Sequence, residues 1–280
     1  MDVVYLNGEY LPIAEAKVSV MDRGFLFADG VYEVVTVYHG KLFRAKEHLK
    51  RLHHSLDAVG ISLPISDAEC IDIFEELIDK NIKEPIETIY MQVTRGSAPQ
   101  RKHVISEPIK PTIFVRCQLV KKRQERQGIK TITVQDIRWK RCDIKGTNRL
   151  ANVLMSQQAF EVGADEAIIV DDQQVIEGAT SNIFIVKDHT IYTPPHSNRL
   201  LAGVIRDLIV ELANKHQLNL KEIPISLDDC FKADEVWVTS SSREITPVTK
   251  IDDKLIGNGS PGSMYEMMIK FYYEYIESLR

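Results

Sequence analysis

Residues 136–145 read DIRWKRCDIK, and residues 177–182 read EGATSN. The first stretch ends in Lys145, and the second begins with Glu177. Neither residue is diagnostic alone, because a lysine in a charged stretch is usually solvated and a glutamate before glycine usually belongs to a turn. The meaning of the two stretches therefore depends on the rest of the chain.

The chain of 280 residues can bury a sizeable core, and we expect two domains rather than one. The polar segment 120–128 is where we place the boundary between a smaller N-terminal domain, 1–120, and a larger C-terminal domain, 121–280. Helical and strand-like patterns occur in both parts, and no repeat of fixed period is visible. This pattern predicts an α+β fold.

The periodicity of apolar residues predicts the individual elements. We expect helices at 45–59, 67–81, 149–162, 204–216 and 263–278. We expect strands at 3–6, 31–38, 41–43, 89–94, 112–119, 131–135, 166–170, 183–186, 190–192 and 235–239.

Charge and cysteine usage exclude several classes of protein. The formal net charge is only −5, and acidic and basic residues are interspersed along the chain. Because there is no basic stripe of the kind that binds nucleic acid, we expect no nucleic-acid partner. The four cysteines, Cys70, Cys117, Cys142 and Cys230, are too widely spaced for a zinc ribbon or a compact disulfide framework. We expect no metal site, no membrane span and no signal peptide, and we interpret the cysteines as reduced thiols of a cytoplasmic protein.

The two opening stretches closely resemble those of the fold type IV aminotransferases, which depend on pyridoxal phosphate. The resemblance continues in the family's order over essentially the whole chain, at 22–24 (DRG), 29–33 (DGVYE), 48–52 (HLKRL), 201–206 (LAGVIR) and 239–247 (TSSSREITP). Within the family, the pattern is most similar to the D-amino acid aminotransferases. The resemblance implies that pyridoxal phosphate is bound between the two domains, with its lysine on the C-terminal domain.

Lys145 and Glu177 match the two residues that this cofactor chemistry requires. The resemblance implies that the Lys145 amine forms a Schiff base with the cofactor aldehyde and later acts as general base at the substrate Cα. It implies that Glu177 lies against the pyridine nitrogen and keeps it protonated, so that the ring can accept electrons.

Other cofactor contacts are implied residue by residue. The family pattern assigns the phosphate to Arg51, to the backbone amides of Val204 and Ile205 at a helix start, and to the hydroxyl of Ser241. Leu201 matches the apolar residue that packs on the ring. Arg51 could equally be a solvated helix residue, and the choice among serines 240–242 stays open.

The substrate carboxylate is assigned to Arg101 and His103 in the loop 96–110, together with Tyr32. A guanidinium offers paired donors that fit a carboxylate, and the imidazole and phenol add further donors. Arg95 is a competing candidate. For Arg138 and Trp139, packing is at least as plausible as contact with a ligand.

These assignments predict a ping-pong transamination of D-amino acids, in which D-alanine and 2-oxoglutarate give pyruvate and D-glutamate. The alternatives are a branched-chain L-amino acid aminotransferase, an (R)-amine transaminase and an aminodeoxychorismate lyase of the same fold. A catalytically silent carrier or structural dimer has little support, because both Lys145 and Glu177 are present. The resemblance also implies a homodimer in which the carboxylate-binding loop reaches the neighbouring subunit's site.

Overall fold

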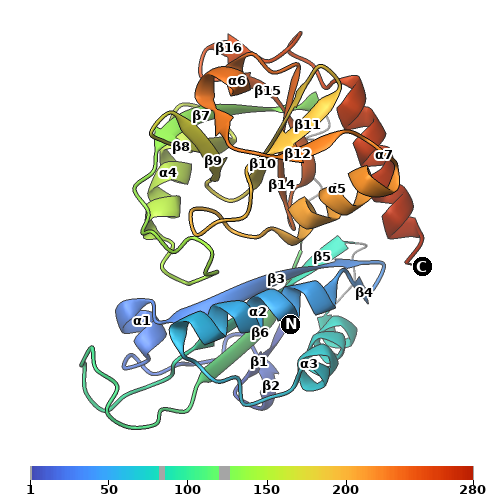
Figure 1. Ribbon diagram of the computed structural model, residues 1–280. Coiled ribbons are helices and arrows are strands. Elements are labelled where there is room, and N and C mark those ends of the chain that lie inside the picture. The colour runs from blue at the N-terminus through green and yellow to red at the C-terminus, as the bar shows by residue number, and fades with distance from the viewer. Residues whose placement is uncertain (1, 82–85, 120–126, 280) are drawn as a thin grey trace. The chain divides into compact units, whose positions relative to one another are not determined.

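The computed structural model describes residues 2–81, 86–119 and 127–279 (Figure 1). The chain forms two compact units: the first comprises 1–122 and 144–149, and the second comprises 123–143 and 150–280. The boundary expected within 120–128 falls largely on residues outside the described ranges. No helix in the described residues is long and apolar enough to cross a membrane.

The first unit contains a six-stranded antiparallel sheet with three helices. The strand order is β2 (Glu9–Pro12), β1 (Val3–Leu6), β6 (Thr112–Leu119), β5 (Ile86–Thr94), β3 (Gly30–Tyr38) and β4 (Lys41–Leu42). The helices are α1 (Arg23–Phe27), α2 (Ala45–Val59) and α3 (Asp67–Asn81). Both long helices have the bounds that the apolar periodicity predicted.

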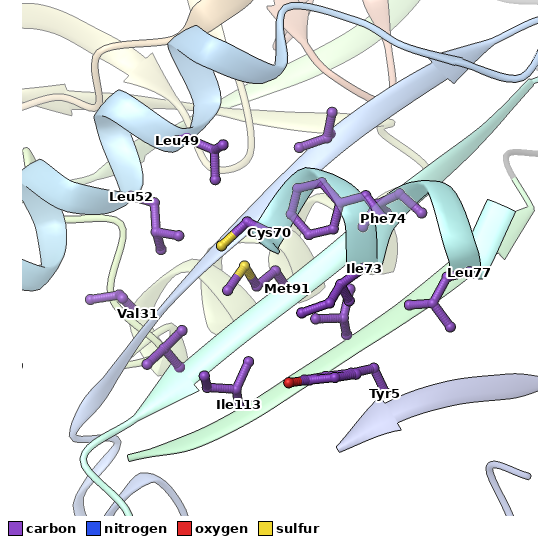
Figure 2. Packing of buried hydrophobic residues seen from close by; sticks show 14 of the residues in the cluster. Tyr5, Val31, Leu49, Leu52, Cys70, Ile73, Phe74, Leu77, Met91 and Ile113 are labelled. Atoms are coloured by element: carbon purple, nitrogen blue, oxygen red, sulfur yellow. The ribbon is translucent and has the colours of Figure 1, made fainter. Parts of the chain in front are cut away.

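The core of this unit lies between the sheet and the two long helices. Leu49, Leu52 and Leu56 of α2 are buried at helical spacing and pack with Val31 and Val35 of β3. Figure 2 shows side chains from α2, α3 and the strands gathered in this cluster. Because alternate residues of a strand face one side, Glu33 shares the α2-facing side of β3 with these valines.

The segment that carries Lys145 is attached to β3. The Tyr32 amide donates to the Lys145 carbonyl at 3.0 Å, and the Thr147 amide donates to the Gly30 carbonyl at 2.9 Å. An isolated antiparallel bridge joins Val31 to Gly146. The sequence led us to expect Lys145 in the C-terminal domain, but this backbone pairing groups 144–149 with the first unit.

The second unit is built on a ten-stranded mixed sheet. Its strand order is β12 (Leu220–Glu222), β11 (Thr190–Thr193), β10 (Asn182–Lys187), β14 (Glu235–Ser240), β15 (Glu244–Ile251), β7 (Ile129–Gln135), β8 (Glu166–Asp171), β9 (Gln174–Gly178) and β13 (Ile225–Ser226), with β16 (Lys254–Leu255) beside β15. Its helices are α4 (Leu150–Glu161), α5 (Val204–Lys215), α6 (Leu227–Phe231) and α7 (Ser263–Glu277).

The predicted strands and helices of this unit are confirmed to within two residues at each end. The strands β9, β12, β13, β15 and β16 and the short helix α6 were not predicted. Most of them are too short for an apolar alternation to develop.

The buried carboxylate of Glu235 fixes the start of α7. Its Oε1 accepts from the Met264 amide at 2.9 Å, and its Oε2 accepts from the Tyr265 amide at 2.8 Å and the Trp237 indole at 3.0 Å. A negative charge at a helix N-terminus is favourable, and here it also satisfies three N–H donors. Gly262 is required beside it, because a Cβ at this position would lie 2.2 Å from the Glu235 carboxylate.

We predict that Glu235→Ala lowers the free energy of unfolding by about 2–4 kcal/mol, because three N–H groups lose a charged acceptor in the interior. Glu274→Ala is the matched control, since Glu274 is 55% exposed on the same helix and pairs with Lys270 at its surface. The control should change stability by about 0.5 kcal/mol or less. Urea unfolding followed by circular dichroism measures both, and equal losses would contradict the capping role.

Candidate active site

The amine of Lys145 lies in the first unit, over the ring of Tyr32. Its Nζ is 4.6 Å from the ring centroid, and its backbone amide donates to the Ser55 hydroxyl of α2 at 3.0 Å. Burial lowers the pKa of the Lys145 amine below its ordinary value, although Tyr32 acts in the opposite direction. A lowered pKa favours the neutral amine, which is the form that reacts with an aldehyde.

The ring of Tyr90 stacks against Tyr32, with the two centroids 5.7 Å apart. Burial by itself would raise the pKa of the Tyr32 phenol, but the positive charges of Lys145, Arg149 and Arg51 together outweigh it and the pKa is lowered. Tyr32 and Lys145, which the sequence assigned to substrate and cofactor, therefore lie together.

Arg51 points into the first unit rather than into solvent. Its Nε and Nη2 donate to the two carboxylate oxygens of Glu33 at 2.7 and 2.8 Å, and His48 Nδ1 lies 2.8 Å from the same carboxylate. Burial opposes ionisation of Glu33, but the Arg51 guanidinium and His48 outweigh it and hold the pKa well below its usual range. A fixed, buried guanidinium suits an anion-binding role.

His48 completes this cluster. It is 1% exposed, and its Nε2 has no hydrogen-bond partner within the described residues. Burial lowers the pKa of His48, so the ring is neutral. The sequence motif contained Glu33 and His48, but sequence reasoning gave neither of them a role.

The loop that carries Arg101 and His103 is exposed, and both side chains lie against Phe27. The Arg101 guanidinium is 4.7 Å from the Phe27 centroid, and the His103 ring is 5.1 Å from it. The structure thus brings together the two residues that the sequence assigned to the substrate carboxylate. Tyr32, the third member of that assignment, lies against Lys145 and Tyr90.

Arg95, the competing candidate for the substrate carboxylate, is already hydrogen-bonded to other groups of the protein. It donates to both carboxylate oxygens of Asp29 at 2.8 and 3.0 Å and to the carbonyls of Val59 and Gly60 at 2.6 and 2.7 Å. These bonds tie it to the end of α2, so the geometry favours Arg101 for the carboxylate.

In the second unit, Glu177 of β9 is buried beside Arg138. Arg138 Nη1 donates to Glu177 Oε1, while its Nε and Nη2 donate to the carboxylate of Asp136 at 3.0 and 2.9 Å. Burial works against the charge of Arg138, but Asp136 and Glu177 outweigh it and raise its pKa. For Arg138, sequence reasoning left packing and ligand contact open, and the Asp-x-Arg spacing was the signal that could have revealed the ion pair.

The second oxygen of Glu177 is also fixed. Its Oε2 accepts from the Asn182 side-chain amide at 3.3 Å and from the Leu201 backbone amide at 3.1 Å. Asn182 also donates to the Leu201 carbonyl at 2.8 Å. Leu201 and Glu177, predicted from separate motifs, therefore lie in contact, and Asn182 bonds to both of them.

Val204 and Ile205 form the first turn of α5, which has no capping side chain among the described residues. Their amides therefore lie at the positive end of the helix dipole. Gly203 precedes them, and a Cβ there would lie 1.9 Å from the Asn182 amide oxygen. Ser241 lies in the turn between β14 and β15.

We predict that Arg138→Met lowers the free energy of unfolding by about 3 kcal/mol or more, because it leaves two carboxylates without their buried cation. Arg141→Met is the control, since Arg141 lies in the same stretch but is 47% exposed and pairs with Asp143. Its cost should be about 1 kcal/mol or less. Chemical unfolding of both variants tests this, and a neutral Arg138→Met would mean that the buried pair is not needed.

Comparison with known proteins places this geometry in a family. Residues 30–251 match the family Amino-transferase class IV. The D-alanine aminotransferase of Staphylococcus aureus (strain N315) is 40% identical over 283 residues, which cover 99% of both chains. The predicted family is thus confirmed.

Solved structures of related enzymes have the same fold as this chain. The branched-chain amino acid aminotransferase of Escherichia coli has a TM-score of 0.90 at 25% identity, covering 98% of this chain and 94% of its own. The T.th. enzyme of the same name, with pyridoxamine 5'-phosphate, has a TM-score of 0.89 at 27% identity, covering 97% and 93%. The predicted α+β fold of type IV is thus confirmed. The chain belongs to the class IV aminotransferases, enzymes whose cofactor is pyridoxal phosphate.

Proposed function

We propose that this aminotransferase acts on D-amino acids, converting D-alanine and 2-oxoglutarate into pyruvate and D-glutamate in two half-reactions. The observation that carries the proposal is the placement of Arg101 and His103 together on Phe27, which supports their assignment to the substrate carboxylate, while Arg95 is tied to Asp29. The D-alanine aminotransferase relative, at 40% identity, supports the same substrate class. The branched-chain enzymes support the alternative less well, since they share the fold at 25–27% identity.

The residues present fit pyridoxal phosphate. Arg51, the Val204 and Ile205 amides and Ser241 would hold the phosphate, with Leu201 against the ring. The described groups suit it: a buried guanidinium, an uncapped helix start, an amine of lowered pKa and a fixed carboxylate that can accept from the pyridine nitrogen. When bound, the cofactor supplies an aldehyde and a ring that takes up electrons from the substrate.

Lys145 would hold the cofactor covalently and then, once substrate has displaced it, move the proton from the substrate Cα. Its lowered pKa suits both tasks, because only the neutral amine can attack a carbonyl or accept a proton. Glu177 would hold a proton at the pyridine nitrogen. Arg138, Asn182 and the Leu201 amide fix that carboxylate, so it need not reorganise during the reaction.

The position at which the α-carboxylate is held determines which enantiomer of the amino acid can react. Proton removal requires the Cα–H bond to stand perpendicular to the cofactor ring on the lysine side. Once Arg101, His103 and Tyr32 hold the carboxylate, only one enantiomer presents its hydrogen to Lys145. We assign that enantiomer as D because the chain is similar to a D-alanine aminotransferase.

Two further features of the proposal concern assembly and compartment. A homodimer is supported by the apolar side chains that α4 exposes, among them Leu150 at 71% and Phe160 at 74%. A cytoplasmic location is supported by the four cysteines, which form no disulfide among the described residues. Burial raises the pKa of Cys70 and Cys230 to about 12, so these two thiols are unreactive.

Borohydride reduction of the holoenzyme, followed by peptide mapping, should place the cofactor on Lys145. Lys145→Ala should abolish turnover and labelling while still binding the cofactor noncovalently, because the phosphate and ring contacts remain. Lys140→Ala, at an exposed lysine five residues earlier, should retain both. A label on another lysine would remove Lys145 from its role.

Pyruvate formation from D-alanine and L-alanine, with 2-oxoglutarate as acceptor, tests the substrate class. We expect a strong preference for D-alanine and a loss of roughly 100-fold in kcat/KM for Arg101→Leu, since a charge-assisted pair of hydrogen bonds is removed. Lys102→Leu, the exposed neighbour, is the control and should change little. Preference for L-alanine would favour the branched-chain alternative, and an unchanged Arg101→Leu would place the carboxylate elsewhere.

A further inference from the structure

Arg23 of α1 donates hydrogen bonds to the backbone of the loop that carries Arg101 and His103. Its Nη1 donates to the Lys102 carbonyl at 2.5 Å, and its Nη2 donates to the His103 carbonyl at 3.1 Å. Arg23 is only 6% exposed, whereas residues 101–108 are exposed. A buried guanidinium thus holds two consecutive carbonyls of an exposed, irregular loop.

The turn before α1 fixes both ends of the same loop. At the first end, the Arg23 amide donates to the Gly96 carbonyl at 2.9 Å, and Asp22 forms a bridge with Ser97. At the other end, the Thr112 hydroxyl donates to the Asp22 carboxylate at 2.7 Å. The segment 22–23 therefore contacts the beginning, the middle and the end of the loop.

Phe27, one turn further along α1, supports the loop's side chains. The Arg23 guanidinium lies 4.9 Å from its centroid, and Arg101 and His103 lie 4.7 and 5.1 Å from it. A cation over an aromatic face is attracted by the electrons of the ring. The same ring thus contacts Arg23 and both residues assigned to the carboxylate.

Asp29 sets the direction in which Arg23 points. Its Oδ2 accepts from Arg23 Nε at 2.7 Å, while Arg95 donates to both of its oxygens. Burial would raise the pKa of Asp29, but the hydrogen bonds from Arg95 and Arg23 outweigh it and the pKa is lowered. Asp29 therefore stays anionic at neutral pH and directs the two terminal nitrogens of Arg23 toward the loop.

We propose that Arg23 is a positioning residue for substrate binding: with Phe27, it orders the backbone of 102–103 so that Arg101 and His103 present their donors to the substrate carboxylate. This inference rests on the proposed assignment of Arg101 and His103. Exposed loops are the least stable parts of a structure, so without Arg23 the donors would have to be ordered when substrate binds.

The test is steady-state kinetics of the holoenzyme carrying Arg23→Met, with D-alanine and 2-oxoglutarate. Because both substrates carry an α-carboxylate, both KM values should rise by at least about tenfold, while kcat changes by less than about threefold. Borohydride labelling at Lys145 should be unchanged. Arg23→Lys, which keeps a charge but not the forked donors, should recover part of the loss.

Arg95→Met is the matched control, because Arg95 shares Asp29 with Arg23 but bonds the carbonyls of Val59 and Gly60 instead of the loop. It should leave both KM values near those of the wild type. A uniform loss of kcat in Arg23→Met, or equal KM changes in both variants, would overturn the positioning role. If Arg23→Met does not fold, Phe27→Leu carries the same test with the same criteria.

Arg101→Leu, measured in parallel, separates this inference from the proposed function. If Arg101→Leu leaves both KM values unchanged, the carboxylate assignment fails, and the role of Arg23 fails with it. If Arg101→Leu raises them and Arg23→Met does not, the assignment stands and only the role of Arg23 is refuted.

Discussion

The short backbone pairing between 145–147 and the edge of β3 is the constraint on which the chemistry of the first unit depends. It places the Lys145 amine over Tyr32, while the next residue of the strand, Glu33, turns to the opposite face and meets Arg51. Because strand residues alternate in direction, one strand presents a phenol on one side and a buried carboxylate on the other. The pairing with 145–147 also covers a part of the β3 edge that β4 leaves unpaired.

Both units bury a carboxylate against an arginine, and in each the pair serves to hold a charge in place. Taking two charges out of water is costly, so such pairs contribute little to stability compared with apolar packing, yet removing one partner is strongly destabilising. Glu33 holds Arg51, for which we propose a role in binding the phosphate, and Arg138 holds Glu177, for which we propose a role at the pyridine nitrogen. Charges fixed in this way need not reorganise when charge develops at the substrate, which is how preorganised sites lower a barrier.

Much of this arrangement could be predicted from the sequence. Lys145 and Glu177 lie in continuous motifs, and the apolar spacing of Leu49, Leu52 and Leu56 predicted the bounds of α2 correctly. The attachment of 144–149 to the first unit could not be predicted, because backbone hydrogen bonds between distant segments leave no trace in side-chain pattern. The contact between Arg23 and the loop could not be predicted for the same reason, because its acceptors on the loop are backbone carbonyl groups. For Arg138 the sequence left packing and ligand contact open, because nothing in the local pattern shows that its buried partners are Asp136 and Glu177.

The central claim is that the Lys145 amine removes the Cα proton of a D-amino acid. Hydrogen exchange at Cα tests it most directly: holoenzyme is incubated in D₂O with D-alanine or L-alanine, without an acceptor, and deuterium at Cα is followed by NMR. We expect rapid exchange of D-alanine by the wild type, slow exchange of L-alanine, and none of either by Lys145→Ala. Faster exchange of L-alanine, or exchange that persists in Lys145→Ala, would contradict it.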